Sequence, residues 1–367
     1  MHETDETETI QEPAAQPIET DKGQESTELI KSSLDLLRAA RKELAHRIIG
    51  QQDMIDGLLT VLIAGGHILL EGVPGLAKTR AVKALAEITG LEFKRIQFTP
   101  DLLPGDLTGT LVWDQGTGTF SVRKGPIFAN VILADEINRA PAKVQSALLE
   151  AMEEKQVTIG EKSYPLPDPF FVLATQNPIE HEGTYALPEA ELDRFFLKLM
   201  IKYPSIDDEL RILDLAPPFA ANNAQEPLKQ LLDLSGIEML RRAADSVFID
   251  PGIMQYIVSI SAATRPKQAN PSVVHGASRG GFTSDAQRDG IYRYIAFGVS
   301  PRSSLALCRC SRVRALLDGR SYVIPEDVKE SAYPVMRHRL VLSYEAEADG
   351  LETDSVISRI LSLLPVP

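Results

Sequence analysis

Shortly after the apolar run Ile68-Leu69-Leu70, the sequence reads Gly72-Val73-Pro74-Gly75-Leu76-Ala77-Lys78-Thr79. A strand, a glycine-containing turn and a Lys-Thr pair that opens a helix are typical of a phosphate-binding loop. The turn directs backbone N–H groups at the phosphates, and the helix N-terminus adds partial positive charge. Lys78 would reach the β- and γ-phosphates, and the Thr79 hydroxyl would ligate Mg²⁺. Because Ala77 replaces the last glycine of the usual motif, the segment taken alone could also be an ordinary strand-to-helix turn.

A second segment supports the nucleotide interpretation, because its apolar run Val131-Ile132-Leu133-Ala134 ends in Asp135 and Glu136. A continuous apolar run indicates a parallel strand that is covered on both faces. At the carboxyl end of that strand, Asp135 is expected to hold Mg²⁺ beside Thr79. Glu136 is then placed to orient and deprotonate an attacking water. The alternative is a strand that simply ends in solvated acids.

The overall charge argues against general binding to nucleic acid or to an anionic membrane. The net charge is −13 over 367 residues, and residues 1–27 contain eight acidic residues and one lysine. A net charge of −6 therefore remains for the rest of the chain. The length suggests two domains, and residues 1–27 are predicted to form a disordered acidic tail.

Cysteine content and hydropathy favour a cytoplasmic protein without stable membrane insertion. Cys308 and Cys310 are the only cysteines, which gives no disulfide framework and too few ligands for structural zinc. The acidic N-terminus does not resemble a secretory signal. The longest apolar stretch, Leu58 to Leu70, is too short to span a bilayer.

From residue 67 to residue 201, predicted strands alternate with predicted helices, which indicates a parallel sheet covered by helices on both faces. The expected strands are His67–Leu70, Glu92–Phe98, Asn130–Ala134, Phe170–Ala174 and Phe195–Ile201. The expected helices are Thr79–Ile88, Ala142–Glu154 and Pro188–Arg194. Two β-hairpins are expected as insertions, at Gly109–Val122 and Gln156–Ser163.

The domain prediction places the nucleotide-binding αβα domain at residues 28–204, a proline-rich linker at 205–227 and a smaller all-helical lid domain at 228–367. Helices in the lid are expected at Leu228–Leu234, Gly236–Ser246, Gly252–Ala263, Ser303–Asp318 and Pro325–Arg337. Residues 266–288 are rich in Gly, Ser, Pro and Asn and are predicted to form a long loop.

With these motifs in place, the chain resembles the AAA+ ATPases and, within them, the MoxR family. The resemblance covers everything after the tail, in the order and spacing of eight segments. They are Gly72–Thr79, Leu133–Ala140, Gln145–Glu153, Ala174–Pro178, Leu187–Phe195, Gly298–Arg302, Pro325–Val328 and Arg337–Leu340. MoxR-like loops also have this form at the position of Ala77. His181 and Val299 replace the more familiar glutamine and alanine.

The resemblance implies roles for four further residues. Asn177 matches sensor 1, Arg194 matches the arginine finger, and Arg302 matches sensor 2. An arginine finger donates a fixed fork of N–H groups to the transferred phosphoryl, often from a neighbouring subunit. Gln51 matches the position at which such proteins contact the adenine base. The alternatives are an Asn-Pro turn at Asn177, an ion pair of Arg194 with a neighbouring acid, and a surface arginine at position 302.

The two hairpins match the helix-2 insert and the pre-sensor-1 hairpin, which mark the branch containing MoxR, the magnesium chelatase motor subunits and the MCM-type helicases. The resemblance therefore implies ATP and Mg²⁺ as ligands, and a homo-oligomer in the form of a hexameric ring. It also implies a client protein, and proteins that contain a von Willebrand factor A domain are one candidate class. No nucleic-acid partner is expected.

We therefore predict Mg²⁺-dependent ATP hydrolysis coupled to remodelling or activation of a client protein. The alternatives are a metal-chelatase motor subunit, a nucleic-acid-dependent motor and a non-hydrolysing scaffold. The scaffold is disfavoured because the chain has Glu136, Asn177 and Arg194, and a protein that only binds nucleotide has no need of all three.

Overall fold

The computed structural model describes residues 19–367, apart from 74, 117, 179–182, 216–226 and 266–289. Within this part of the chain, five strands form a sheet in the order β2-β5-β8-β1-β9, and every neighbouring pair is parallel. The strands are β1 (Ile68–Glu71), β2 (Phe93–Gln97), β5 (Val131–Asp135), β8 (Phe171–Gln176) and β9 (Leu197–Met200). The predicted parallel sheet is confirmed.

Helices cover both faces of the sheet. Successive side chains of each strand point to opposite faces, so alternate residues pack against different helices. Leu133 and Leu173 pack on one side, with helices α2 (Gln52–Ala64) and α3 (Lys78–Thr89). Ile132 packs on the other side, next to α4 (Pro104–Thr108), the 3-10 helix η1 (Ile137–Arg139) and α5 (Ala142–Glu154). The apolar runs in the sequence are therefore strands that are buried on both faces.

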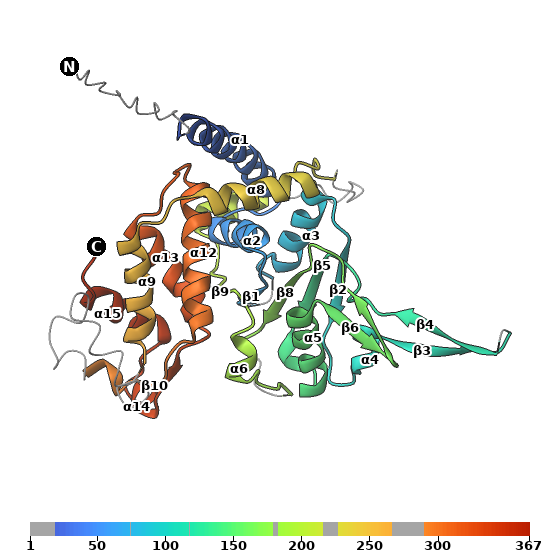
Figure 1. Ribbon diagram of the computed structural model, residues 1–367. Coiled ribbons are helices and arrows are strands. Elements are labelled where there is room, and N and C mark those ends of the chain that lie inside the picture. Colours follow the sequence, from blue (N-terminus) through green and yellow to red (C-terminus); the bar gives the residue numbers. More distant parts are fainter. Residues whose placement is uncertain (1–18, 74, 117, 179–182, 216–226, 266–289) are drawn as a thin grey trace, which may run out of the picture.

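The lid domain lies beside the sheet domain (Figure 1). Its helices are α8 (Leu234–Ser246), α9 (Pro251–Ala263), α12 (Pro301–Leu317), α13 (Pro325–Met336), α14 (Tyr344–Ala348) and α15 (Thr353–Leu363). Side-chain oxygens cap four of these helices: Asp233 on α8, Asp250 on α9, Ser300 on α12 and Ser343 on α14. The lid also contains a small antiparallel pair, β10 (Ile295–Phe297) with β11 (Val341–Leu342), which the sequence pattern did not reveal.

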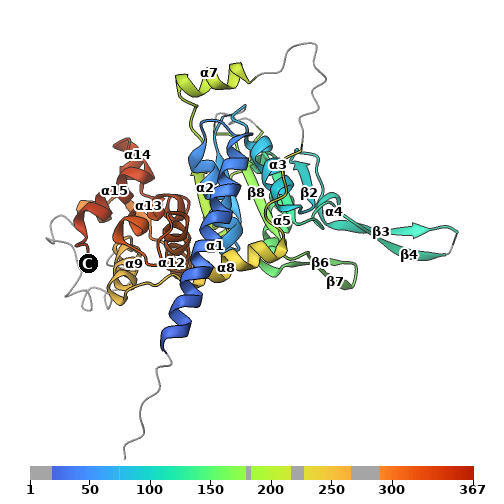
Figure 2. The same cartoon turned by 90° about the horizontal axis from the view of Figure 1, so that it is seen from above.

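Both predicted hairpins are present. The first, β3 (Gly109–Asp114) with β4 (Thr119–Lys124), projects away from the body (Figure 2). The second is β6 (Gln156–Ile159) with β7 (Lys162–Pro165). Gly109 has a φ of +100°, and a Cβ there would lie 2.3 Å from the Arg123 carbonyl oxygen, so only glycine fits at the base of the first hairpin.

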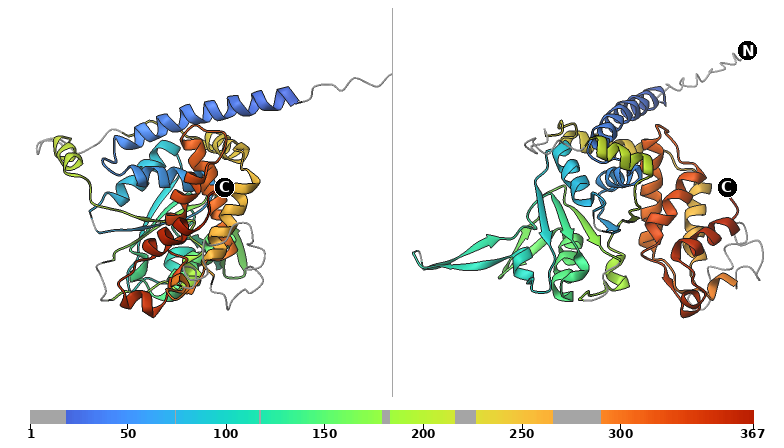
Figure 3. Two further views of the ribbon diagram at one scale, coloured as in Figure 1. Left: turned by 90° about the vertical axis from the view of Figure 1, so that its left-hand side faces the viewer. Right: turned by 180° about the vertical axis from the view of Figure 1, so that it is seen from behind.

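The predicted tail is wrong over residues 19–27. Helix α1 spans Glu19–Ala45 and lies along the lid and the sheet domain (Figure 3), whereas residues 1–18 lie outside the described part. The acidic segment 19–27 still contains good helix formers such as glutamate, lysine and glutamine. Because an α-helix satisfies its own backbone hydrogen bonds, it extends beyond the apolar stripe that anchors it.

The predicted linker contains a helix, α7 (Ile206–Asp214), which Ser205 caps by accepting a bond from the Asp208 N–H. Its apolar side chains at Ile206, Leu210 and Leu213 have helical spacing, but the surrounding prolines concealed the pattern. In the lid, residues 228–233 form neither helix nor strand, so the predicted helix Leu228–Leu234 is wrong, and the first helix there begins at Leu234. The predicted loop 266–288 and His181 lie outside the described residues.

None of the helices described here has both the length and the apolarity needed to cross a bilayer.

Candidate nucleotide site

The turn between β1 and α3 begins at the carboxyl edge of the sheet. The Gly72 N–H donates to the Gln176 carbonyl at the end of β8, over 3.3 Å. Gly75 and Ala77 both have positive φ, +88° and +58°, and Ala77 is the N-cap of α3. Left-handed backbone turns the chain so that α3 begins at Lys78 with its first N–H groups towards the turn. Leu76 is buried in the core, whereas Pro74 is outside the described residues.

Lys78 lies within electrostatic reach of the acidic pair. Its Nζ donates to the Gly72 carbonyl oxygen at 2.5 Å. Burial lowers the pKa of the Lys78 ammonium, and the charges of Asp135, Glu136 and Glu71 act in the opposite direction. The structure therefore brings the predicted phosphate-binding lysine together with both predicted carboxylates.

Asp135 is held by hydrogen bonds from two neighbouring strands. The Thr175 hydroxyl of β8 donates to Asp135 Oδ1 at 2.7 Å, and Arg95 Nη2 of β2 donates to Oδ2 at 2.6 Å. The two bonds hold both oxygens of this carboxylate in place.

Glu136 adopts a left-handed backbone with a φ of +57°, directly after the end of β5. The Gln97 Nε2 donates to its Oε2 at 2.7 Å, and the Arg139 Nε lies 3.2 Å from the same oxygen. The backbone N–H of Glu136 donates to the Thr175 hydroxyl at 2.8 Å. The side chain predicted to act as the base therefore has a defined position.

Four residues around the acidic pair were missed by the sequence analysis: Thr175, Arg95, Gln97 and Arg139. Thr175 lies near the end of β8, and Gln97 is the last residue of β2 and lies directly opposite Asp135 in the β2–β5 register. Arg95 is in the middle of β2, and Arg139 is in η1. For Thr175 and Gln97, a polar residue at the end of a predicted strand was a usable signal. The neighbour relation of β2 and β5 was not visible in the sequence, so these contacts could not be assigned.

The donor set fits a magnesium ion that arrives with phosphates. No group of three or more His, Cys, Asp or Glu that could hold a metal occurs in the described part of the chain. Mg²⁺ is usually held by one or two protein oxygens together with phosphates and waters. The Thr79 hydroxyl at the start of α3 and the Asp135 carboxylate are oxygen donors of the kind that such an ion needs.

Asn177 follows the last residue of β8 and is buried, at 5% exposure. It therefore lies at the same carboxyl edge of the sheet as Gly72 and Asp135. This position is compatible with the predicted contact to the γ-phosphate, which remains a prediction.

Arg194 and Arg302 lie at the opposite edge of the sheet. Arg194 comes shortly before β9. Two residues after it, the N–H of Phe196 donates to the carbonyl oxygen of His67, the residue that precedes β1. Gly72 and Lys78 come after β1, so the length of that strand separates Arg194 from its own phosphate-binding turn. Arg302, in the first turn of α12, binds the same carboxylate as Arg194, that of Glu153. The structure therefore brings these two arginines together, away from Lys78 of the same chain.

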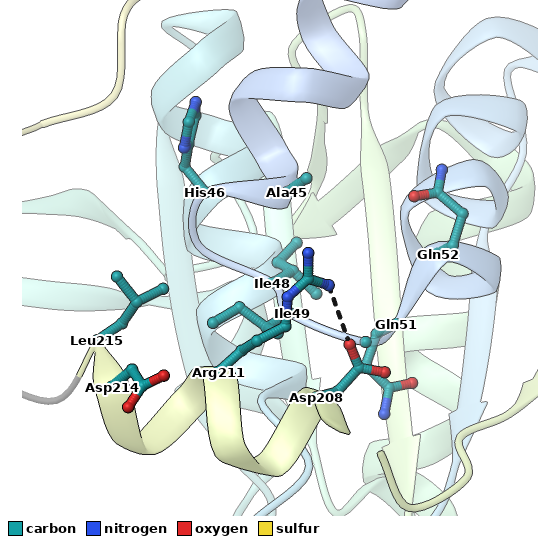
Figure 4. Close-up of a pocket in the computed structure, with 11 residues that line it drawn as sticks. Ala45, His46, Ile48, Ile49, Gln51, Gln52, Asp208, Arg211, Asp214 and Leu215 are labelled. Atoms are coloured by element: carbon teal, nitrogen blue, oxygen red, sulfur yellow. Dashed lines mark hydrogen bonds and ion pairs between the residues drawn. The ribbon is translucent and has the colours of Figure 1, made fainter. Parts of the chain in front are cut away.

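Gln51 lines a cavity of about 660 Å³ between α7 and the turn that joins α1 to α2 (Figure 4). Its Nε2 donates to the Lys202 carbonyl oxygen just after β9, at 2.8 Å. Asp208 and Arg211 of α7 line the same cavity and form an ion pair at 3.4 Å. Strands β1 and β9 are parallel neighbours, and Lys202 follows β9 just as the phosphate-binding turn follows β1. The cavity is therefore at the same carboxyl edge of the sheet as that turn.

Two protein-family models match the sequence. The model of the ATPase family associated with various cellular activities (AAA) matches residues 67–197. A model of an AAA lid domain matches residues 291–360.

Similar proteins match over nearly the whole chain. Chaperone MoxR1 of Mycobacterium tuberculosis is 44% identical over 342 residues, 92% of this chain and 84% of that protein. YeaC of Bacillus subtilis is 43% identical over 332 residues, 90% of this chain and 95% of that protein. Protein MoxR of Paracoccus denitrificans is 32% identical over 341 residues, 90% of this chain and 96% of that protein. A crystal structure of a Cytophaga hutchinsonii protein assigned as an ATPase has a TM-score of 0.80 and 42% identity, and the match covers 94% of this chain and 99% of that chain.

Proposed function

This chain belongs to the MoxR family of AAA+ ATPases, and we propose that it couples the hydrolysis of ATP to the remodelling of a client protein. ATPase activity follows from the family. The observation that supports a working hydrolytic site is that Lys78 opens α3 after β1 while Asp135 ends β5 and Glu136 follows it, so all three lie at the carboxyl edge of one parallel sheet. A scaffold that only binds nucleotide has no need of a positioned base.

In the proposed reaction, Lys78 and the N–H groups of the turn bind the β- and γ-phosphates. Glu136, oriented by Gln97 and the Thr175 hydroxyl, accepts a proton from the attacking water. Asn177 holds the water or the γ-phosphate. Thr79 and Asp135 would hold a magnesium ion, which neutralises charge on the phosphates.

The arginine finger is proposed to act between protomers. Arg194 and Arg302 are at the sheet edge opposite to their own Lys78, so each can serve a phosphate only in a neighbouring chain. A closed ring, which we propose to be a hexamer, gives every protomer such a neighbour.

The client is proposed to bind the β3–β4 hairpin. Trp113 and Phe120 are 50% and 65% exposed, and their rings meet edge to face with centroids 4.9 Å apart. Exposed aromatic pairs of this kind are typical anchors in protein interfaces. Proteins with von Willebrand factor A domains are the proposed client class, and the cytoplasm, where ATP is abundant, is the proposed location.

We expect Glu136→Gln to reduce phosphate release by at least about 100-fold, because the amide cannot accept the proton of the water. ATP binding, measured by calorimetry, should remain, since the lysine and the turn are unchanged. Wild-type turnover in this variant would remove Glu136 from the role of the base.

The same variant, loaded with ATP, tests the client proposal. We expect it to retain a bound protein on affinity purification, and to lose that protein when Trp113→Ser and Phe120→Ser are added. The matched control changes two lid aromatics that are similarly exposed, Phe248→Ser and Tyr322→Ser, and should keep the protein. Retention of DNA in place of protein would instead support a nucleic-acid motor.

A further inference from the structure

Glu153, in the last turn of α5, contacts arginines from two different domains. Its Oε2 lies 2.9 Å from Nε of Arg194, which precedes β9 in the nucleotide-binding domain. Its Oε1 accepts a 2.7 Å hydrogen bond from Nη2 of Arg302, in the first turn of α12 of the lid. One carboxylate therefore joins the two arginines that the family resemblance associates with the phosphates.

Both arginines keep most of their donors for another ligand. Arg194 meets Glu153 through Nε, and Arg302 meets it through one terminal nitrogen. Neither guanidinium forms another side-chain pair within the described part of the chain. A guanidinium has five N–H donors in a rigid fork. Phosphate oxygens can therefore bind the remaining donors while Glu153 holds both groups in place.

Glu153 also balances charge in a strongly basic recess. A cavity of about 280 Å³ is lined there by Arg194, Arg302, Arg309 and Arg339, with the carboxylates of Glu153 and Asp193. Asp193 is occupied by Arg339 of the lid at 2.8 Å, and it also accepts a bond from the Ser300 hydroxyl. Glu153 is thus the carboxylate that lies between Arg194 and Arg302, whose charges would otherwise repel each other.

The other end of α5 is fastened to the segment that follows Glu136. The buried Gln145 donates through Nε2 to the carbonyl oxygens of Ile137 and Ala140, at 3.1 Å each. The helix has 13 residues. At 1.5 Å per residue it is a rigid rod of roughly 20 Å between the Glu136 turn and Glu153.

We infer that Glu153 is a positioning residue for hydrolysis in the neighbouring protomer. It holds the guanidinium groups of Arg194 and Arg302 side by side for that protomer's phosphates, and α5 links it to the Glu136 turn of its own chain. This inference rests on the proposed trans role of Arg194.

The test uses mixed oligomers in which a guest protomer in large excess surrounds wild-type protomers. The reference guest bears Glu136→Gln and contributes no hydrolysis of its own. The test guest also bears Glu153→Gln. The matched control guest instead bears Glu154→Gln, a change of the next glutamate of α5, which is exposed. Turnover per wild-type protomer should be roughly tenfold lower with the test guest than with the other two guests, because misplaced arginines stabilise the transition state poorly.

Equal turnover with all three guests would overturn the inference. A fourth guest, Glu136→Gln with Arg194→Ala, separates this failure from that of the proposed function. If the fourth guest also supports full turnover, no arginine acts in trans. If it abolishes turnover while the Glu153→Gln guest does not, the finger stands and only the role of Glu153 is wrong.

A homogeneous Glu153→Ala protein gives a second measurement. We expect kcat to fall roughly tenfold with the KM for ATP unchanged, because the residues that bind a protomer's own ATP are intact. A raised KM with an unchanged kcat would contradict the inference, since it would indicate a general disturbance of the binding site.

Discussion

At the residue scale, Thr175 connects the carboxylate of Asp135 to the backbone of Glu136. Its hydroxyl donates to Asp135 Oδ1 and accepts from the Glu136 N–H, at 2.7 and 2.8 Å, and the residue is 1% exposed. A single oxygen therefore fixes both the end of β5 and the left-handed turn at Glu136. The sequence analysis used the Ala174–Pro178 segment only as a family match and gave Thr175 no role.

We expect Thr175→Val to lower kcat about 10- to 100-fold, because valine has the same shape but leaves Glu136 without its anchor. The variant also leaves the Glu136 N–H without a partner, so the free energy of unfolding should fall by about 1–3 kcal/mol. Steady-state phosphate release and urea denaturation measure the two effects.

The control for this prediction is Thr89→Val. The Thr89 hydroxyl is buried but donates only to carbonyls of its own helix, those of Leu85 and Ala86. Its removal orphans no N–H group, so kcat should stay at the wild-type value. An equal loss of kcat in both variants would mean that threonine hydroxyls act only through general stability.

At the element scale, His67 joins three elements of the nucleotide-binding domain. It precedes β1, its Nδ1 accepts a 3.1 Å bond from the Val172 N–H of β8, and its Nε2 donates to the Met152 carbonyl of α5. Nδ1 can accept only when it bears no proton, so this arrangement requires the neutral imidazole. Burial lowers the pKa of His67 from 6.5 to about 4, the bond to Met152 raises it, and the charge of Lys155 lowers it.

This pKa shift predicts a loss of stability in mild acid. As the pH falls below 6.5, the unfolded chain binds a proton at His67 while the folded chain does not until about pH 4. The free energy of unfolding should therefore fall by at most about 3 kcal/mol over this interval. In His67→Gln, where nothing titrates at this position, that part of the slope should vanish in urea denaturation between pH 7 and pH 4.5.

The exposed His46 provides the control. His46→Gln should follow the wild-type curve, and the buried His338 is present in all three proteins, so its titration cancels in the comparison. If the curve of His67→Gln runs parallel to the wild-type curve, the proposed cause of the acid sensitivity is wrong.

Most elements of the nucleotide-binding domain could be predicted from the sequence because periodicity and caps are local properties. Helix α5 has the predicted bounds, and all five strands lie within one or two residues of the prediction. Helix α7 and the segment 19–27 were missed for different reasons. The apolar residues of α7 have helical spacing, but the prolines around the helix concealed that pattern, whereas the segment 19–27 contains no apolar stripe for periodicity to detect.

At the scale of the whole molecule, the sequence could not reveal which residues face which phosphate. The position of Arg194 relative to Lys78 depends on the sheet order and on the side of the sheet domain that the lid packs against. The lid is fixed there by contacts with the residues around Arg194: Arg339 binds Asp193, and His338 binds the Phe195 carbonyl at 2.9 Å. Contacts across such long sequence separations leave no local pattern, so the sequence could suggest a trans role for Arg194 only through the family resemblance.

The trans arrangement predicts that two inactive variants restore each other's activity. Arg194→Ala keeps its own Lys78 and Glu136 but presents no finger, whereas Glu136→Gln presents a finger but has no base. Each protein alone should release phosphate at no more than about 1% of the wild-type rate, because a finger contributes at least 10³-fold and a base at least 10²-fold.

In a random mixture at equal proportions, half of the protomers have the intact base and half of their neighbours have the intact finger. Roughly one quarter of the wild-type turnover should therefore return, provided that the protomers form closed rings and exchange freely. Light scattering with ATP and Mg²⁺ checks that rings form. An Arg302→Ala variant, used in place of Arg194→Ala, should regain activity in the same mixture, since the two arginines meet at the Glu153 carboxylate. If the mixture of exchanging rings stays inactive, each arginine must serve its own nucleotide, and the lid would have to leave its observed position to bring Arg302 to the phosphates.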